Sequence, residues 1–367
     1  MSQEHPVNPA GSEPPAVQFP AVFSVEEFFD STAQWRTLAA PNLCAVLGRP
    51  IAHSLSPLLH NSAYLDDQLP FTYVRIDAGE AWEIRTLLEN SGADVRGFSV
   101  TMPGKSAALE LADAATERAT AIGTANTLVP QGDGTWLADN TDVDGVSACL
   151  EDLHIEHGIN FAGTRGIVVG NGGTARPAVA ALAAQGVTHV TVLARSERAL
   201  NLQSLVEAFG MEFSWARFDE SQVDELCADA SVVISTIPAA GAKPLVPSLL
   251  RAESVVDVIY DPYPTPLLSA AAEAALPHAD GLRMLAGQAE RQYELFTGQA
   301  PQQGHMLNTV MSHRAYLQAF HSRLNWWLAP PRAVLLCPHG VGYVGFLYCD
   351  VLGRARYVVR RQQIPHP

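Results

Sequence analysis

Short apolar runs alternate with amphipathic stretches over the first third of the chain. The runs LCAVLG and VRGFSVT, at residues 43–48 and 95–101, are typical of strands, and FTYVRID at residues 71–77 has the period-two alternation of a half-buried strand. Between them, AWEIRTLLENSG at residues 81–92 predicts a helix that ends in a glycine cap. Strands that alternate with helices in this way predict a small α/β domain.

The second half of the chain repeats the pattern with longer apolar stretches. RGIVVGNGGTARPAVAALAAQG, residues 165–186, leads from a β-branched run through a glycine loop into an alanine-rich helix, and a second strand follows at residues 189–196. Pro177 is compatible only with the first turn of that helix, so it fixes where the helix begins. SVVISTIP and SVVDVIY, at residues 231–238 and 254–260, are typical of buried parallel strands. This is a doubly wound, nucleotide-binding pattern.

The glycine loop has the form G-x-G-x-x-A. It comprises Gly170, Asn171, Gly172, Gly173, Thr174 and Ala175. The first glycine permits a tight turn, the second lets the backbone approach a pyrophosphate, and the alanine allows close packing of a helix whose N-terminus faces the phosphates. A strand before the loop and a helix after it are the required context, so dinucleotide binding is favoured. A plain glycine-rich turn and a methyltransferase cofactor loop are the alternatives.

The end of the second strand distinguishes the two nicotinamide cofactors. An NAD site usually places Asp or Glu there to hold the ribose 2′-hydroxyl. This chain has Arg195, Ser196 and Arg198 instead, and a basic pair suits the 2′-phosphate of NADP, which a carboxylate would repel. NADP is therefore favoured over NAD. The alternative is that Arg195 is a solvated arginine at a strand end.

Composition and charge narrow the class of protein. The 367 residues suffice for two domains, and the net charge of −15 argues against nucleic acid as the main partner, although a local arginine cluster could still bind a small anion. The five cysteines form no CxxC pair, which suits a reducing, cytoplasmic compartment. Residues 1–20 are rich in proline and carry no Lys or Arg, so we expect a disordered extension rather than a targeting peptide. Pro338 and several glycines interrupt the last apolar run, so no membrane span is expected.

Lysine is almost absent from this chain. Lys105 and Lys243 are the only two among 23 basic residues. Arginine keeps its proton in proteins, whereas a partly buried lysine can release it, so Lys105 is a candidate for proton transfer. The simpler interpretation is a surface lysine retained by chance. The turn-like stretch ADNTDVDG, residues 138–145, offers two carboxylates, Asp142 and Asp144, one of which could pair with Lys105, and a nearby loop contributes Asn126.

A second polar stretch follows the first strand. Ser54 and Ser56 stand two residues apart, where an extended loop would point both hydroxyls the same way and let them grip a carboxylate. The alternative is that they cap the helix that Pro57 would open. His53 and His60 have no third ligand at metal spacing, so they are expected to be structural and no metal is expected.

Together these stretches resemble the shikimate dehydrogenase family. The matching pieces, in order, are G-x-P-I-x-H-S-x-S-P-x-x-H-N at residues 48–61, x-V-T-x-P-x-K at 99–105, A-N-T at 125–127, N-T-D-x-x-G at 140–145, D-x-x-Y with T-P-L at 257–260 and 265–267, and G-x-x-M-L-x-x-Q-A at 281–289. The nucleotide loop lies between the fourth piece and the fifth. Six pieces in the family order make the resemblance specific, and it covers about residues 43–298.

The resemblance implies an activity and a set of roles. The family reduces 3-dehydroshikimate to shikimate, reversibly and with NADPH, in chorismate and aromatic amino-acid biosynthesis. By resemblance, Lys105 is the general acid and base, and its catalytic partner Asp142 mainly orients it. The implied substrate-binding residues are Ser54 and Ser56 for the carboxylate, Thr101, Asn126, Asp142 and Gln288 for ring oxygens, and Tyr260 near the cofactor. Besides the glycine loop and the basic pair, the implied cofactor contacts are Thr236, Ile259 and Gly281.

The resemblance also implies how the chain is organised. The expected fold class is α/β, with an N-terminal α/β substrate-binding domain over residues 42–144 and a doubly wound Rossmann NADP-binding domain over residues 145–286. Helices over about residues 287–325 are expected to return and complete the first domain, and the ligand cleft should lie between the domains. A partly disordered extension, 1–41, and a tail, 326–367, match nothing in the family. The expected state is a monomer or a homodimer.

One departure from the family pattern bears on specificity. Ser99 stands where the commonest pattern has Asn; serine is shorter but can still bond a ring hydroxyl, which leaves room for quinate as a second substrate. One alternative function is therefore a quinate/shikimate dehydrogenase that uses NAD, against which Arg195 speaks. The other is a non-catalytic homologue that senses pathway metabolites. Lys105 together with Asp142 speaks against that homologue, because sensing needs no proton donor.

Overall fold

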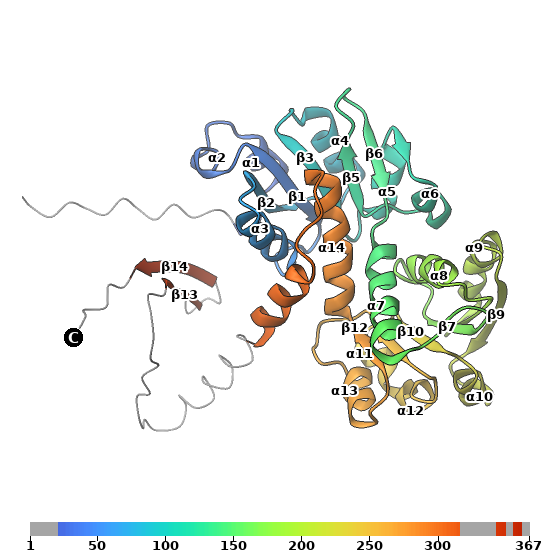
Figure 1. Cartoon of the computed structure of the whole chain (residues 1–367). Coiled ribbons are helices and arrows are strands. Elements are labelled where there is room, and N and C mark those ends of the chain that lie inside the picture. The colour runs from blue at the N-terminus through green and yellow to red at the C-terminus, as the bar shows by residue number, and fades with distance from the viewer. Residues whose placement is uncertain (1–20, 316–342, 350–354, 362–367) are drawn as a thin grey trace, which may run out of the picture. The chain divides into compact units, whose positions relative to one another are not determined.

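Residues 21–315 form two sheets of six strands each, together with the helices around them (Figure 1). The structure is a computed structural model that describes residues 21–315, 343–349 and 355–361. The chain divides into two units, residues 1–315 and 316–367. In the second unit, β13 (Tyr343–Cys349) and β14 (Ala355–Arg361) pair antiparallel. Residues 1–20, which were predicted to be disordered, lie outside the described residues, and so does most of the tail.

The first sheet is mixed and has the order β2-β1-β3-β5-β6-β4. Its strands are β1 (Asn42–Gly48), β2 (Phe71–Asp77), β3 (Val95–Val100), β4 (Ala114–Ala115), β5 (Thr127–Pro130) and β6 (Trp136–Asp139). Strand β1 pairs in parallel with β2 and β3, whereas β5 pairs antiparallel with β3 and β6. The three strands predicted from apolar runs are β1, β2 and β3, so those predictions are confirmed.

Helices pack against this sheet, and a single bridge before the first helix extends its edge. They are α1 (Val25–Phe29), α2 (Gln34–Leu38), α3 (Ser56–Asp66), α4 (Ala81–Asn90), α5 (Lys105–Leu111) and α6 (Glu117–Ile122). Before α1, Phe23 bridges to Ile76 of β2, and its amide donates to the Arg75 carbonyl at 2.9 Å. Phe28 and Trp35 are buried in the core of the same domain. Residues 21–41 are therefore part of this domain's packing, although they match nothing in the family pattern.

The predicted glycine cap of α4 is wrong. The helix ends with Ser91 as its C-cap, in extended backbone with φ −70° and ψ 125°. The Ser91 hydroxyl donates to the Leu87 carbonyl at 2.6 Å and so satisfies a carbonyl of the last turn. A left-handed glycine is therefore not needed to end this helix.

The second sheet is wholly parallel and has the order β12-β11-β10-β7-β8-β9. Its strands are β7 (Arg165–Val169), β8 (His189–Ala194), β9 (Glu212–Arg217), β10 (Val232–Ser235), β11 (Val255–Asp257) and β12 (His278–Asp280). Its helices are α8 (Ala175–Ala184), η1 (Glu197–Leu202), α9 (Gln203–Ala208), α10 (Val223–Ala228), α11 (Ala239–Ala242), η2 (Lys243–Leu245), α12 (Val246–Leu249) and α13 (Pro266–Glu273). The chain reverses at β7 and winds both ways, as predicted, and Pro177 lies in the first turn of α8.

Two long helices link the sheets. Helix α7 (Asp142–His157) leads from β6 toward β7, and α14 (Gly281–Thr297) leads from β12 back to the first sheet. They run side by side in Figure 1, α7 in green and α14 in orange, and meet at glycines. A Cβ added at Gly145 would lie 2.5 Å from the Met284 carbonyl oxygen, and one at Gly287 would lie 2.8 Å from Ala148 Cβ. Larger residues at these two positions would force the helices apart.

Helix α14 begins earlier than the predicted helical stretch at residue 287. Asp280 is its N-cap, and its carboxylate accepts from the amides of Leu282 and Arg283 at 3.1 and 2.9 Å. A second helical segment spans residues 305–315. No helix within the described residues is long and apolar enough to cross a membrane.

Candidate active site

A lysine–aspartate pair lies where two helices of the first domain begin. Lys105 is the first residue of α5, just after β3, and Asp142 is the first residue of α7, just after β6. The Lys105 ammonium donates to Asp142 Oδ2, and only 18% and 10% of the two side chains are exposed. Asp142 also lies in the first turn of its helix, where the dipole favours a negative charge. The pair is thus largely shielded from water.

Asn126 fixes the other oxygen of the carboxylate. Its side-chain Nδ2 donates to Asp142 Oδ1 at 2.9 Å and to Thr141 Oγ1 at 3.0 Å, and its Oδ1 accepts from the Thr141 backbone amide at 2.7 Å. The antiparallel pairing of β5 with β6 brings this segment beside the start of α7. Both Asp142 oxygens therefore have partners before any ligand arrives.

A buried hydrogen-bond network lies next to Asn126, and the sequence analysis did not predict it. Ser99 is 4% exposed, accepts from the Tyr73 hydroxyl at 2.6 Å and donates to Gln292 Oε1 at 2.7 Å. Its one proton is therefore engaged, so Ser99 could meet a ring hydroxyl only as an acceptor. The sequence carried one signal for Gln292: it stands four residues after Gln288, on the same helix face.

The two serines after β1 lie side by side. Helix α3 begins at Ser56, and its N-cap is Leu55, which makes no side-chain cap bond. The Ser54 and Ser56 hydroxyls are 3.3 Å apart, and Ser54 Oγ also accepts from the Ser56 amide at 3.3 Å. Ser56 is thus the first helical residue rather than part of an extended loop. Arg75 holds this turn by donating Nε and Nη2 to the Ser54 carbonyl at 3.0 and 2.5 Å.

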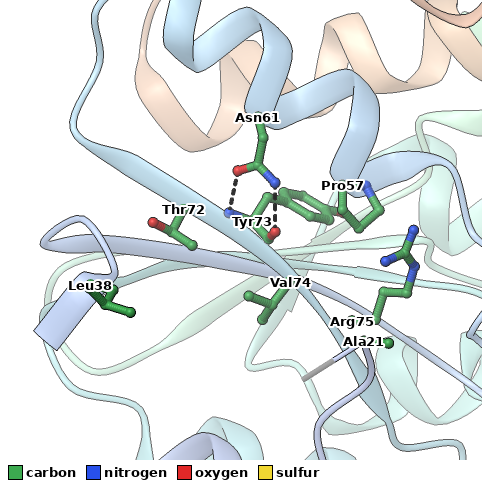
Figure 2. Close-up of a pocket in the computed structure, with 8 residues that line it drawn as sticks. All are labelled: Ala21, Leu38, Pro57, Asn61, Thr72, Tyr73, Val74 and Arg75. Atoms are coloured by element: carbon green, nitrogen blue, oxygen red, sulfur yellow. Dashed lines mark hydrogen bonds between the residues drawn. The ribbon is translucent and has the colours of Figure 1, made fainter. Parts of the chain in front are cut away.

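A cavity of about 460 Å³ lies beside β2 and contains none of the predicted site residues (Figure 2). It is lined by Ala21, Leu38, Pro57, Asn61, Thr72, Tyr73, Val74 and Arg75. Figure 2 shows the Asn61 side chain pairing with the backbone amide and carbonyl of Tyr73, at 2.9 and 2.8 Å. This cavity borders the serine turn through Arg75, but the chemistry of the Lys105 pair lies elsewhere.

The remaining predicted substrate residues stand on other elements. Thr101 follows β3 and donates its amide to the Leu47 carbonyl at 2.8 Å. Gln288 on α14 is 8% exposed, and its amide donates to the Leu285 carbonyl at 2.9 Å. Burial raises the pKa of Tyr260, whose carbonyl accepts from Arg314. Within the described residues, none of the three hydrogen-bonds Lys105 or Asp142, so their roles stay predictions.

The glycine loop has room for a phosphate group. Gly170 has φ +105°, a left-handed value that favours glycine, and an added Cβ would lie 2.6 Å from Ile237 Cγ2. A Cβ added at Gly172 or Gly173 would meet nothing within 4 Å, so the backbone there faces open space. Helix α8 begins at the buried Ala175. The loop therefore presents backbone amides and a helix N-terminus without side chains in the way.

The other predicted cofactor residues differ in their surroundings. Arg195, Ser196 and Arg198 directly follow β8 and are exposed, so their donors can reach a ligand. The Thr236 hydroxyl donates to the Val169 carbonyl at 2.8 Å. A Cβ added at Gly281 would lie 2.6 Å from the Val258 carbonyl oxygen, so close packing against this backbone suffices to explain the glycine. Ile259 is half-buried.

An arginine network that sequence reasoning missed supports the start of α7. Arg118 donates Nε and Nη2 to the two oxygens of Asp139, both at 2.7 Å, and its Nη1 lies 2.8 Å from Asp144 Oδ2. Burial raises the pKa of Asp139, but Arg118 outweighs burial and holds that pKa below its usual value. Burial raises the pKa of Asp144, although Arg118 opposes the shift. Asp139 and Asp144 flank Asp142, so Arg118 braces the segment that carries it.

Arg176 joins the glycine loop to the first domain. It follows Ala175 at the start of α8 and donates to the carbonyl of Ile122, the last residue of α6. Its Nη1 also donates to the Asn201 carbonyl at 3.3 Å. Burial lowers the pKa of Arg176, and its hydrogen-bond partners are backbone carbonyls of both domains.

A doubly wound sheet with an open glycine loop, in the same chain as a shielded lysine–aspartate pair, is typical of a nicotinamide-dependent oxidoreductase. Two family models match the chain: the shikimate dehydrogenase substrate binding domain over residues 46–128, and the shikimate 5′-dehydrogenase C-terminal domain over residues 281–311. A shikimate dehydrogenase (NADP(+)) of Methylobacterium radiotolerans is 37% identical over 267 residues, which are 70% of this chain and 91% of that protein.

Solved structures agree with the sequence comparisons. The shikimate dehydrogenase of Mycobacterium tuberculosis is similar with a TM-score of 0.69 and 41% identity, over 74% of this chain and 100% of that one. A quinate dehydrogenase of Corynebacterium glutamicum, in complex with NAD, is similar with a TM-score of 0.65 and 28% identity, over 74% and 99% of the two chains. The chain belongs to the shikimate dehydrogenase family. The predicted fold class and the predicted family are both confirmed.

Proposed function

We propose that this chain catalyses the reversible, NADP-dependent reduction of 3-dehydroshikimate to shikimate in aromatic amino-acid biosynthesis. The observation that carries the proposal is the shielded Lys105–Asp142 pair, in a chain that also has an open glycine loop directly after β7. Relatives named shikimate dehydrogenase (NADP(+)) support it, because they match over most of their own length.

Proton transfer is the part of the reaction that this chain's own residues supply. NADPH, when bound, supplies a hydride to the ketone carbon. Reduction makes the ketone oxygen negative, and that oxygen needs a positioned donor and then a proton. The Lys105 ammonium meets both needs, and Asp142 Oδ2 aims it. In the reverse direction Lys105 accepts the hydroxyl proton, which arginine cannot do.

The substrate is held by groups of different chemistry. We assign its carboxylate to the adjacent Ser54 and Ser56 hydroxyls. We assign the ring oxygens to polar side chains and the cofactor junction to an aromatic residue. These residues are Thr101, Asn126, Asp142 and Gln288 for the ring, and Tyr260 for the cofactor junction.

The cofactor site fits NADP. The amides of the glycine loop hold the pyrophosphate, and the exposed pair Arg195 and Arg198, with Ser196, holds the 2′-phosphate. Thr236, Ile259 and Gly281 lie along the rest of the cofactor. A carboxylate in place of Arg195 would instead favour NAD.

The finer organisation belongs to this proposal too. We assign substrate binding to residues 42–144, with helices of about 287–325, and cofactor binding to residues 145–286. Cytoplasmic localisation and a monomeric or homodimeric state stay predictions.

One assay tests the proposal. Formation of the reduced cofactor, NADPH or NADH, is followed by absorbance with shikimate or quinate and with NADP or NAD, for the natural chain and for Lys105→Ala. We expect turnover with shikimate and NADP, and a loss of several orders of magnitude in the variant. Preferred turnover of quinate with NAD would support the quinate dehydrogenase alternative. Shikimate binding without turnover for any pair would instead indicate a sensor.

A further inference from the structure

Gln292 is a buried glutamine whose amide is fully engaged. It lies on α14, one helical turn after Gln288, and is 1% exposed. Its Oε1 accepts from Ser99 at 2.7 Å, and its Nε2 donates to Thr127 Oγ1 at 2.9 Å and to the Asn126 carbonyl at 3.2 Å. One acceptor and two donors are thus matched to three partners, and the side chain ties α14 to β3 and β5.

These bonds continue to the carboxylate of the site. The Thr127 hydroxyl, which accepts from Gln292, donates to Asn126 Oδ1 at 2.8 Å. Asn126 Nδ2 then donates to Asp142 Oδ1 at 2.9 Å, and Asp142 Oδ2 binds Lys105. Gln292 therefore holds Asn126 twice, through its backbone carbonyl and through Thr127.

The amide of Asn126 can serve Asp142 only in one orientation. If the amide flipped, it would present its oxygen to a carboxylate, which cannot donate when ionised. Thr127, which accepts from Gln292, donates its own proton to Asn126 Oδ1 at 2.8 Å, a shorter contact than the 3.3 Å to Thr141 Oγ1, and this leaves the Asn126 nitrogen toward Asp142. The Thr141 amide supports the same orientation from the other side at 2.7 Å.

We propose that Gln292 is a positioning residue, which acts through Thr127 and Asn126 to hold Asp142 in the orientation that aims Lys105. The inference rests on the proposed dehydrogenase function and adds a residue to its machinery. Gln292 acts on the rate of the chemical step, because its partners reach the proton donor. Gln288, one turn earlier, is the residue assigned to the substrate.

The isosteric variants Gln292→Met and Thr127→Val test the inference singly and together. Methionine keeps the length of the side chain and removes its donors and its acceptor, and valine removes only the relaying hydroxyl. The matched control is Gln131→Met, at an exposed glutamine whose amide bonds only the Val129 carbonyl in its own turn, at 3.2 Å.

We expect each single variant to lower kcat about tenfold and to raise KM for shikimate by a smaller factor, because Asn126 and Asp142 are also assigned to the substrate. The double variant should also lose about tenfold rather than a hundredfold, because both changes break one path. Gln131→Met should match the natural chain. Thermal unfolding of each variant identifies one that has lost its fold, and Thr127→Val then tests the same path from its other end.

Three results would overturn the inference while the natural chain turns over shikimate. They are an unchanged kcat in Gln292→Met, a raised KM with kcat intact, and single losses that multiply in the double variant. Absence of turnover in the natural chain itself would overturn the proposed function, and the inference with it.

Discussion

His60 offers a quantitative prediction about stability and pH. It lies on α3 with none of its surface exposed, and its ring stacks on Tyr73 with centroids 4.3 Å apart and planes 8° apart. The Tyr64 hydroxyl is 3.4 Å from Nδ1, while Nε2 has no hydrogen-bond partner among the described residues. The Gln292 amide is near enough to act on the imidazole, but outside hydrogen-bond geometry. Burial lowers the pKa of His60 to about 3, and that amide opposes the shift only in part.

The sign of the effect follows from proton linkage. Between pH 6.5 and 3 the unfolded chain binds a proton at His60 and the folded chain does not. The folded state therefore loses stability as pH falls, by about 1.4 kcal/mol for each pH unit well inside this window. The loss sums to about 2 kcal/mol between pH 7.5 and pH 5. Above about pH 7.5 the contribution no longer changes.

Chemical denaturation of the natural chain and of His60→Phe tests this reasoning. Phenylalanine keeps the stacked ring and removes the titrating group. The free energy of unfolding should fall by about 2 kcal/mol more for the natural chain than for the variant between pH 7.5 and pH 5. His157→Phe, at an exposed histidine, should keep the natural pH dependence. Equal pH dependence in the natural chain and His60→Phe would refute the assignment of this effect to His60.

Three further predictions concern charged residues. Lys105→Arg should keep shikimate binding, measured by calorimetry, and lower kcat by roughly 10²–10⁴, because arginine cannot exchange the proton; near-natural turnover would contradict this. Arg195→Gln should raise KM for NADP about tenfold and leave KM for NAD unchanged, since one charged donor to the 2′-phosphate is lost; equal changes for both cofactors would contradict it. Arg118→Met should destabilise the fold by roughly 2–3 kcal/mol, less than a fully buried pair because Arg118 is 27% exposed, and thermal unfolding measures it.

Local pattern was enough for β1, β2 and β3 of the first sheet and for β7, β8, β10 and β11 of the second, because strand alternation and the glycine loop are short-range signals. The other five strands, β4, β5, β6, β9 and β12, were not predicted. The start of α14 was missed because its cap is a single aspartate, Asp280, that resembles any other polar residue in a strand–helix turn. The glycine cap of α4 failed because Ser91 satisfies the helix end by itself.

Some residues of the candidate site could be predicted from the sequence, and others could not. The scarcity of lysine made Lys105 a candidate, the family motifs gave Lys105 and Asp142 their roles, and the structure adds that the two side chains form an ion pair. The engagement of Ser99 could not be predicted, because its partner Gln292 is 193 residues away along the chain. No spacing rule connects two positions that meet only when α14 returns to the first sheet.

The glycine contact between α7 and α14 has a consequence for recombination between relatives. The chain leaves the first sheet along α7 and returns along α14, and the helices meet at Gly145 and Gly287, where backbone and methyl groups leave no slack. A chimera that exchanged the nucleotide-binding half of this chain would cut both crossings. The two helices would have to be inherited together, as one module that includes Asp142, Gln288 and the glycine contact between the helices.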